Sequence, residues 1–477
     1  MEIGSRPHRF SRGKRQSPPK NDEVLDATLY HDQLPLAPSG AQHPRSAELL
    51  EMSHLLDAME APLVSIRHDL TGRRNVGVKK GREGLSAEQV LRIGIIKQMF
   101  GFSYEELAFH LEDSFQLRAF CRLSPSMSPA KKSALQASIG AVRAKTWQAV
   151  NEAIVFEARR RKVEDGRWMR TDATVVESNI HHPLDSALLY DCVRVLTRIM
   201  LRAKADFGTA ACNHARRAKR RSLAILHAGT MERRIPLYKD LLMITKWTLS
   251  CADKAKQQLE SIGTEAICRA SSLSHYLPLV RKVIDQTERR VLRGEQVPAA
   301  EKLVSIFEPH TDIIRKDRRE THYGHKVTLS TGRSGLVLDV VIEQGNPADS
   351  TLAIRSTQRH TDLFGIPPER AAFDGGFASR NNLREIQAAG TTEVCFSKPA
   401  GVSLEQMTTT RAIRRVLKRF RAGIEASISF LKRSFGWTRV SWRGLLHFHA
   451  YVWCSAVAHN LLVLARALIA RHTPSSA

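Results

Sequence analysis

The sequence predicts an α/β protein whose mixed five-stranded sheet, covered by helices, is interrupted by a helical insertion and preceded by an all-helical region. Strand-like alternation of apolar and polar residues first appears over residues 166–178 and returns only after residue 322. The segment between them has helical periodicity throughout. Apolar residues also recur at helical spacing before the first strand. The 477 residues are enough for about two to four domains.

Domain boundaries are expected where these patterns change. Residues 1–45 are rich in Pro, Ser, Arg and Lys with little periodicity, which predicts a disordered basic tail. The other expected units are a helical N-terminal domain at 46–163, expected to bind DNA in the manner of a helix-turn-helix, a sheet domain at 164–178 and 322–436, a basic helical insertion at 179–321 that shares in DNA binding, and a C-terminal helical segment at 437–477.

Two capping boxes mark helix starts in the N-terminal domain. Ser86 is followed by Gln89, and Ser103 by Glu106, at the spacing at which hydroxyl and side chain cap each other's backbone. A third helix is expected from about Ser114. Such a unit suits a helix-turn-helix reader of DNA. It suits equally a packing bundle that touches no base, because capping patterns identify helices and not grooves.

The expected strands are supplied by residues 166–178, a hairpin over 324–345, and residues 369–376 and 392–398. Two aspartates occupy unusual places in them. Asp172 lies in mid-strand, where aspartate is disfavoured, and Asp374 ends a strand of buried type. Asp349 follows the hairpin, where we expect it to cap the next helix, with a supporting role beside the two aspartates as the alternative.

A glutamate on the long helix that follows also occupies an unusual place. The apolar stripe of this helix consists of Ile424, Ile428, Leu431 and Phe435. Glu425 lies one position round from the stripe, in line with Arg421 and Lys432. One interpretation is a surface pair between Arg421 and Glu425. The other is a functional carboxylate at the edge of the core.

The order of these elements matches a ribonuclease H-like fold, with Asp172 on the first strand, Asp374 at the end of the fourth and Glu425 on the closing helix. Three carboxylates from distant segments suit Mg²⁺, which prefers a few hard oxygen ligands and keeps water or phosphate oxygens for the rest. Two such ions about 3.5–4 Å apart can activate the attacking oxygen and stabilise the leaving oxygen of a phosphodiester. We therefore expect these residues to be catalytic and to bind two Mg²⁺ ions, with Mn²⁺ as a substitute.

The charge of the chain points to a polyanionic partner. Lys and Arg number 73 against 48 Asp and Glu, a formal net charge of +25. Nucleic acid is the first candidate, because an anionic membrane would require a basic amphipathic anchor that is not evident. The residues expected to contact DNA are Arg216, Arg217, Lys219, Arg220, Arg221, Arg439 and Trp442. The alternative for the five in the insertion is a solvated basic helix, and Trp437 is expected in the core.

Cysteine usage and hydropathy indicate a cytoplasmic protein. The seven cysteines are scattered and never form a CxxC pair, which argues against a zinc module and a disulfide framework. The N-terminus lacks the apolar run of a secretory signal. Residues 451–470 approach membrane-spanning length but contain His459, Asn460 and Arg466, so we interpret them as a buried helix. His181 and His182 are expected to be loop residues and not ligands.

Four stretches resemble bacterial insertion-sequence DDE transposases, especially the ISNCY group. They are TDATVVESNIHHPLDSALLYDCVRVL, SIFEPHTDIIRKDRRETHYGHKVTLSTGRSGLVLDVVIEQGNPADSTL, AAFDGGFAS and FRAGIEASISFLKRSFGWTRVSWRG, and the resemblance extends over roughly residues 80–470. Arg421, Glu425 and Lys432 reproduce a spacing found on the glutamate helix of related enzymes. A tyrosine is common in one such family at the position of Lys418. The resemblance implies supporting roles for Arg421 and Lys432.

The resemblance also implies an activity and partners. Such a protein would bind double-stranded DNA at the terminal inverted repeats of its own element, cleave there, and join the freed 3′ hydroxyl to target DNA. It would form a homo-oligomer in the synaptic complex and have no membrane partner. The alternatives are a ribonuclease H-like nuclease without strand transfer, and a decayed or domesticated protein that only binds DNA.

Overall fold

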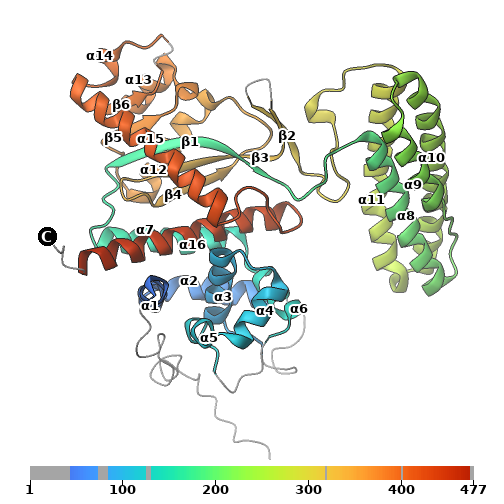
Figure 1. Ribbon diagram of the computed structural model, residues 1–477, viewed down its shortest axis with the longest axis horizontal. Coiled ribbons are helices and arrows are strands. Elements are labelled where there is room, and N and C mark those ends of the chain that lie inside the picture. Colours follow the sequence, from blue (N-terminus) through green and yellow to red (C-terminus); the bar gives the residue numbers. More distant parts are fainter. Residues whose placement is uncertain (1–42, 73–83, 125–129, 317–319, 399–400, 473–477) are drawn as a thin grey trace, which may run out of the picture.

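The computed structural model describes residues 43–72, 84–124, 130–316, 320–398 and 401–472 (Figure 1). Most of the tail expected at 1–45 lies outside these ranges. The first helix begins at Pro44, inside the stretch that was expected to be tail, with the His43 side chain accepting a hydrogen bond from the Arg45 N–H.

Seven helices precede the sheet in the described residues: α1 (Pro44–Asp57), α2 (Ala61–Gly72), α3 (Ala87–Phe100), α4 (Tyr104–Asp113), α5 (Phe115–Phe120), α6 (Lys132–Ile139) and α7 (Ala144–Arg160). Both capping boxes are confirmed: Ser86 opens α3 and Ser103 opens α4, each with its reciprocal hydrogen bond. Ser114 caps α5, as expected. Gly101 ends α3 in the left-handed conformation that favours glycine.

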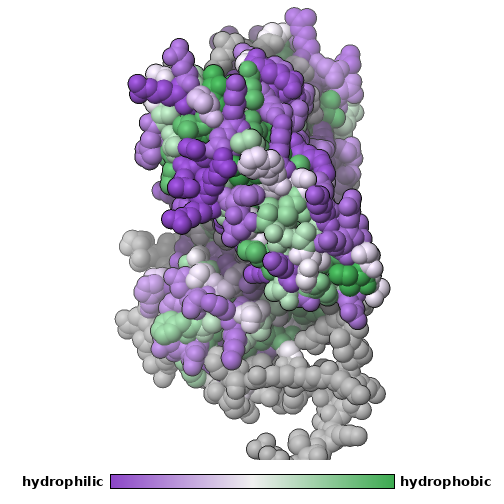
Figure 2. Space-filling model, turned by 90° about the vertical axis from the view of Figure 1, so that its right-hand side faces the viewer, coloured by the Kyte–Doolittle hydropathy of each residue, from purple (hydrophilic) through white to green (hydrophobic). Residues whose placement is uncertain are grey.

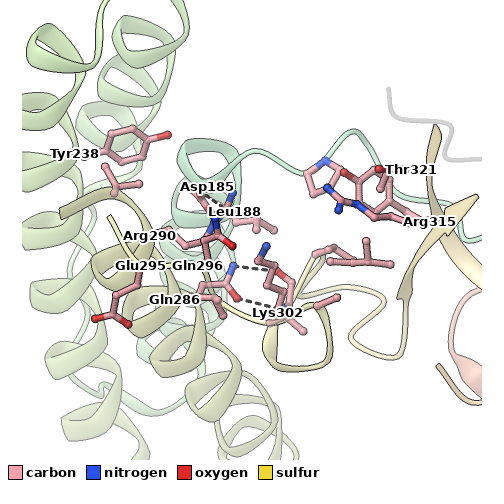
Figure 3. Close-up of a pocket in the computed structure, with 18 of the residues that line it drawn as sticks. Asp185, Leu188, Tyr238, Gln286, Arg290, Glu295, Gln296, Lys302, Arg315 and Thr321 are labelled. Carbon is pink, nitrogen blue, oxygen red and sulfur yellow. Dashed lines mark hydrogen bonds and ion pairs between the residues drawn. The ribbon is translucent and has the colours of Figure 1, made fainter. Parts of the chain in front are cut away.

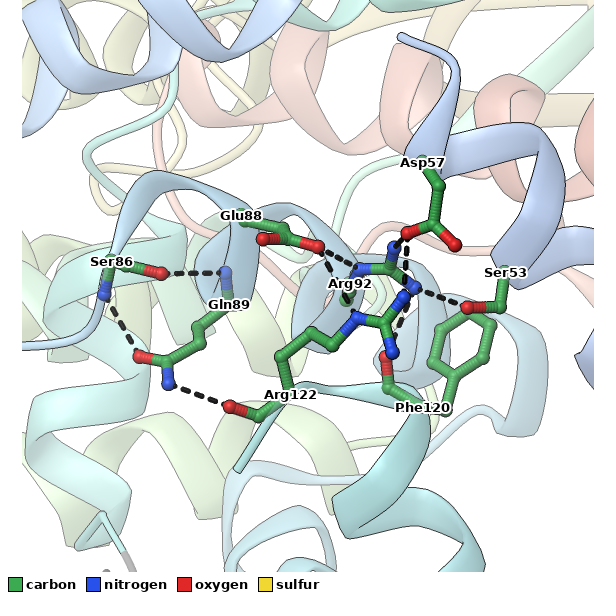
Figure 4. Close-up of polar contacts among 8 residues, drawn as sticks. All are labelled: Ser53, Asp57, Ser86, Glu88, Gln89, Arg92, Phe120 and Arg122. Atoms are coloured by element: carbon green, nitrogen blue, oxygen red, sulfur yellow. Dashed lines mark hydrogen bonds and ion pairs between the residues drawn. The ribbon is translucent and has the colours of Figure 1, made fainter. Parts of the chain in front are cut away.

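A buried charge network joins α1, α3 and α5 (Figure 4). The fully buried Arg92 donates to Glu88 Oε1 at 2.9 Å, to Asp57 Oδ1 at 2.5 Å and to the Ser53 hydroxyl at 2.9 Å. Arg122 binds the same Asp57 oxygen at 2.6 Å. Burial lowers the pKa of Arg92 despite these partners, so the buried charge depends on them, and the network fixes how the three helices pack.

The surfaces of α3 and α4 favour a packing role over groove reading. Ten of the 14 residues of α3 are buried, so this helix is not free to enter a DNA groove. The exposed side chains of α4 are Glu105, Glu106, Phe109, Glu112 and Asp113. DNA phosphates would repel such an acidic face. The structure shows how these helices pack, and DNA reading by this domain stays a prediction.

Within the ranges that the structure describes, the sheet has six strands: β1 (Trp168–Glu177), β2 (Asp312–Lys316), β3 (Glu320–Thr331), β4 (Val337–Ile342), β5 (Arg370–Phe373) and β6 (Glu393–Phe396). The expectation of five strands was therefore wrong by one, β2. This strand pairs with the first part of β3, and β4 pairs with the second part. β1 occupies the other edge of β3 in antiparallel register and is parallel to β5, which is parallel to β6.

Four long helices leave the sheet between β1 and β2: α8 (Asp185–Phe207), α9 (Ala215–His227), α10 (Met231–Ile262) and α11 (Ile267–Thr287). They form a bundle with a hydrophobic core of its own, set beside the sheet (Figure 1). Viewed from the side of the bundle, the surface is largely hydrophilic with smaller hydrophobic patches (Figure 2). Short 3₁₀ helices lie at Thr264–Ala266, Ala299–Glu301, Asp349–Thr351 and Gly375–Phe377, and a π-helix at Glu288–Leu292 follows α11.

The remaining helices are α12 (Ala353–Phe364), α13 (Arg380–Ala388), α14 (Leu404–Met407), α15 (Arg411–Ser434) and α16 (Leu445–His472). Among the described residues, α16 is the one helix long and apolar enough to cross a membrane by length and composition. It is largely buried and packs against α7, α1 and α3. The interpretation of residues 451–470 as a buried helix is thus confirmed, and the C-terminal helix completes the N-terminal core.

Candidate active site

The three expected carboxylates come from neighbouring elements. Thr171 of β1 pairs with Phe373 of the parallel strand β5. Asp172 is the next residue of β1 and Asp374 directly follows the end of β5, so the two aspartates lie side by side. Glu425 comes from α15, which packs across β1, β5 and β6 (Figure 1).

An arginine on β1, which the sequence analysis did not single out, docks α15 on the sheet. Arg170 donates to the Phe420 carbonyl at 2.6 Å and to the Thr331 hydroxyl at 2.7 Å, and its guanidinium lies over the Phe420 ring. A Cβ atom at Gly423 would lie 2.1 Å from the Arg170 guanidinium. Glycine at this position therefore lets α15 approach β1 closely enough to bring Glu425 towards Asp172.

The guanidinium of Arg421 lies among all three carboxylates. Its nitrogens are 3.5 Å from Asp172 Oδ2, 3.1 Å from Asp374 Oδ1 and 3.3 Å from Glu425 Oε1. The pair between Arg421 and Glu425 that the sequence suggested thus exists, but Arg421 also binds the two aspartates. The surface-pair interpretation is too narrow, because the arginine balances the charge of a carboxylate cluster.

The two aspartates differ in their electrostatics. Burial raises the pKa of Asp172 most, and the nearby charges of Asp374 and Asp349 raise it further, against the Ala173 N–H and Arg421. Burial also acts on Asp374, but hydrogen bonds from Ser397 and Gly375 and the charge of Arg421 outweigh it and lower its pKa. Asp374 is therefore the more firmly anionic partner.

A lysine and a fourth carboxylate extend the cluster. Lys326 of β3 forms an ion pair with Asp349 and donates to the Pro347 carbonyl at 2.6 Å. The residue before α12 is Leu352, and no side-chain hydrogen bond caps the start of that helix. The cap expected for Asp349 was therefore wrong, and its side chain faces Lys326 instead. A lysine within a buried strand was the sequence feature that could have revealed this pair.

One cavity of about 900 Å³ joins these groups. Its lining includes Asp172, Asp374, Glu425, Arg421, Lys432, Asp349 and Lys326. The structure thus brings together every catalytic and supporting residue that the sequence predicted. Glu425 is the most solvent-exposed of the three carboxylates, with 65% of its side chain accessible against 18% for Asp172. It can therefore reorient towards a bound cation or substrate.

The basic residues of α9 fall into two groups. Arg217 and Arg221 both bind Asp240 of α10, and Arg217 also lies over the Trp247 ring. Arg216, Lys219 and Arg220 are exposed. The first group is occupied in holding α9 against α10, so the second group is the one available to phosphates.

The other residues expected to contact DNA lie elsewhere. Arg439 pairs with Glu177 at 3.2 Å. Trp442 is only 7% exposed and packs edge-on against Tyr451, so little of its ring is open to a base. Trp437 is fully buried, which confirms its core role. His181 lies 3.5 Å from Asp191.

The carboxylate cluster fits a hard divalent cation by its chemistry. Within the described residues, no group of three or more His, Cys, Asp or Glu side chains stands close enough to hold a metal ion as placed. Asp172, Asp374 and Glu425 nevertheless share one cationic group, the guanidinium of Arg421. Oxygen ligands of this kind suit Mg²⁺ or Mn²⁺.

Comparisons with known proteins identify two regions. Residues 301–461 match the family model described as transposase DDE domain, and residues 40–137 match the model described as transposase domain (DUF772). No curated protein and no solved structure matches the chain. The chain thus carries a DDE transposase domain, for which a ribonuclease H-like fold is implied, in agreement with the mixed sheet. Asp374 and Glu425 lie inside the matched region, whereas Asp172 lies before it.

Proposed function

We propose that the protein is an insertion-sequence transposase that cuts DNA at the terminal inverted repeats of its element and joins the freed 3′ ends to target DNA. The observation that carries the proposal is the convergence of Asp172, Asp374 and Glu425 on Arg421 in one cavity. These residues come from three distant segments, and two of them lie in the matched DDE domain.

Two divalent ions, when bound, would activate the attacking oxygen and stabilise the leaving oxygen of the phosphodiester. Asp172 and Asp374, fixed on adjacent strands, would hold both ions in place. Glu425 would turn from Arg421 to complete the ligand set. Arg421 would then be released to face the phosphate, and Lys326, held by Asp349, would keep positive charge at the wall of the cavity.

DNA binding would rest on the exposed cations of α9 and on the net charge of +25. The N-terminal domain, with its acidic α4, would contribute assembly more than base reading. Joining two element ends requires that they be held together, which is the basis for proposing a homo-oligomer in the synaptic complex. We place the protein in the cytoplasm, with the DNA.

The test is Glu425→Gln, assayed for Mg²⁺-dependent cleavage and strand transfer of labelled duplexes that carry the DNA flanking the gene. Glutamine keeps the size and helix propensity of glutamate. Fold and DNA affinity should therefore persist while the chemistry slows by roughly three orders of magnitude. Glu385→Gln, on the exposed face of α13, is the matched control and should cut normally.

The assay also separates the alternatives. Cleavage without joining by the unaltered protein would indicate a nuclease, and binding without cleavage a protein that only binds DNA. A Glu425→Gln protein that cuts within tenfold of the unaltered one would rule out the carboxylate triad.

A further inference from the structure

A second cavity of about 1020 Å³ lies where the helical bundle meets the sheet (Figure 3). Tyr238 of α10 and Arg290, just after α11, line it from the bundle. Arg315 of β2 and Thr321 of β3 line it from the sheet, and Lys302 lies between the two sides (Figure 3). This cavity plays no part in the chemistry derived above.

The second cavity adjoins the catalytic cavity. Arg315 and Asn346 line both of them. Asn346 begins the loop whose Pro347 carbonyl accepts the hydrogen bond of Lys326, and the same loop leads to Asp349. A chain molecule whose reacting group lies at Asp172 and Asp374 can therefore pass over Arg315 into the second cavity.

Positive charge is in excess along this path. Four cationic side chains line the second cavity, namely Arg234, Arg290, Lys302 and Arg315, against two carboxylates, Asp185 and Glu295. Asp185 is bound at 2.8 Å by Arg290. Burial lowers the pKa of Lys302, and the charges of Arg290 and Arg315 lower it further, against Asp185. Lys302 thus lies in a positive field, which a phosphate would relieve.

Size and aromatic content suit one strand of nucleic acid. The volume is at the upper end of small-molecule sites, which span roughly 300–1,000 Å³, so it has room for a few nucleotides but not for a duplex. Tyr323, which is half-buried, lines the cavity beside the cations; Tyr238 also lines it but is only 8% exposed, so Tyr323 is the ring more open to a base. Cationic grooves with aromatic side chains are the usual means of holding single strands without regard to sequence.

We propose that the second cavity holds a single DNA strand that continues from the phosphodiester in the catalytic cavity, with Lys302 and Arg315 bound to its phosphates. The proposal rests on the proposed function, in that it makes the second cavity an extension of the DNA path. It gives the insertion a part in the site itself: the bundle supplies one wall of the channel that receives the strand.

The test measures binding alone, in EDTA, so that no cleavage takes part. A fluorescein-labelled single-stranded oligonucleotide of mixed sequence is titrated at several salt concentrations, and the slope of log affinity against log salt is compared between variants. Lys302→Gln, which leaves the catalytic cavity untouched, should lower the slope by about 0.7, the value of one lost phosphate contact on a single strand.

Arg269→Gln is the matched control. Arg269 lies near the start of α11, roughly 25 Å along the helix from Gln286 of the cavity. Arg269→Gln removes one positive charge, as Lys302→Gln does, but it should leave the slope unchanged. Thr321→Glu is the second variant, because Thr321 is exposed and pairs with Arg315 across β2 and β3. The added carboxylate should lower the slope too, without disturbing the core.

The outcomes separate this inference from the proposed function. Slopes for Lys302→Gln and Thr321→Glu that equal the Arg269→Gln slope would overturn the inference, even in a protein that cuts DNA. Should Lys302→Gln fail to fold, as judged by circular dichroism, Thr321→Glu decides alone. Binding that depends on Lys302 in a protein that cuts no DNA would contradict the proposed function and not the strand site.

Discussion

At the scale of single residues, Arg421 is the centre of the site. Asp172, Asp374 and Glu425 would repel one another if no cation lay among them, and the guanidinium supplies that cation from within the chain. A divalent ion would compete for the same oxygens. Arg421 and Mg²⁺ should therefore stabilise the folded protein through the same carboxylates. The loss of either one should lower the free energy of unfolding more when the other is absent.

Arg421→Gln tests this competition by thermal unfolding with and without Mg²⁺. Without Mg²⁺ we expect the variant to lose about 1–2 kcal/mol, less than the 3–5 kcal/mol of a fully buried broken pair, because the carboxylates are partly exposed. Mg²⁺ should restore most of that loss, so the melting temperature rises more in the variant than in the unaltered protein. Arg419→Gln, exposed on the same helix, is the control. An equal Mg²⁺ response in all three proteins would contradict the competition.

The three carboxylates could be predicted because each lies in, or directly after, a strand or helix that the local sequence pattern identifies. The sequence could not predict Arg170, which acts through the Phe420 carbonyl 250 residues away. It also misjudged Asp349, since a capping residue and an ion-pair partner look alike until Lys326 is placed beside it. Trp442 was assigned to DNA from its neighbours in sequence, whereas packing against Tyr451 decided its burial.

At the scale of elements, α9 shows that one basic run can serve two purposes. Arg217 and Arg221 lie one helical turn apart, so both side chains reach Asp240. Arg216, Lys219 and Arg220 are exposed to solvent on another face of the helix. The charge of the helix therefore divides between holding α10 and offering a surface for phosphates.

Two sets of substitutions separate these purposes. Arg216→Gln, Lys219→Gln and Arg220→Gln together should weaken binding to duplexes of any sequence and lower the salt slope by up to about 2.7, at about 0.9 per phosphate contact. Arg217→Gln with Arg221→Gln should instead lower thermal stability, because Asp240 loses both partners, and should change the slope much less. A slope that is unchanged in the triple variant would show that the exposed face of α9 is merely solvated.

Most elements were predictable from periodicity and capping, as the hairpin and α15 show. β2 was missed because Ile313 and Ile314 are adjacent, which breaks the alternation expected of a strand. It is also a five-residue strand that pairs with β3 alone. Its existence depends on a partner strand and not on its own pattern.

At the scale of the whole molecule, distant parts of the chain are tied together at the start of β1. His360 of α12 binds the Gly166 carbonyl at 2.7 Å. Gly166 has a φ of +71°, and a Cβ atom there would lie 2.5 Å from Phe364. Glycine is therefore required where α12 meets the chain that leads to Asp172. Burial lowers the pKa of His360 to about 4, so its ring is neutral in the folded protein.

The stability of the whole chain should consequently fall in mild acid. The unfolded histidine takes up a proton below its ordinary pKa of about 6.5, whereas the folded one resists until about 4. Protons thus bind the unfolded state preferentially in this window. The contribution of His360 to the free energy of unfolding is complete above pH 6.5 and is lost as the pH falls towards 4. Between pH 7.5 and 5 the loss from this one residue is roughly 2 kcal/mol.

His360→Gln should flatten this dependence in urea unfolding at pH 7.5 and pH 5. The glutamine amide can still donate to the Gly166 carbonyl but does not titrate. Any loss of stability relative to the unaltered protein at pH 7.5 should shrink or reverse at pH 5. His227→Gln, which changes an exposed histidine, should leave the pH dependence as it is. Identical pH dependences for the unaltered protein and His360→Gln would mean that the ring is already charged in the fold, or that other groups govern acid unfolding.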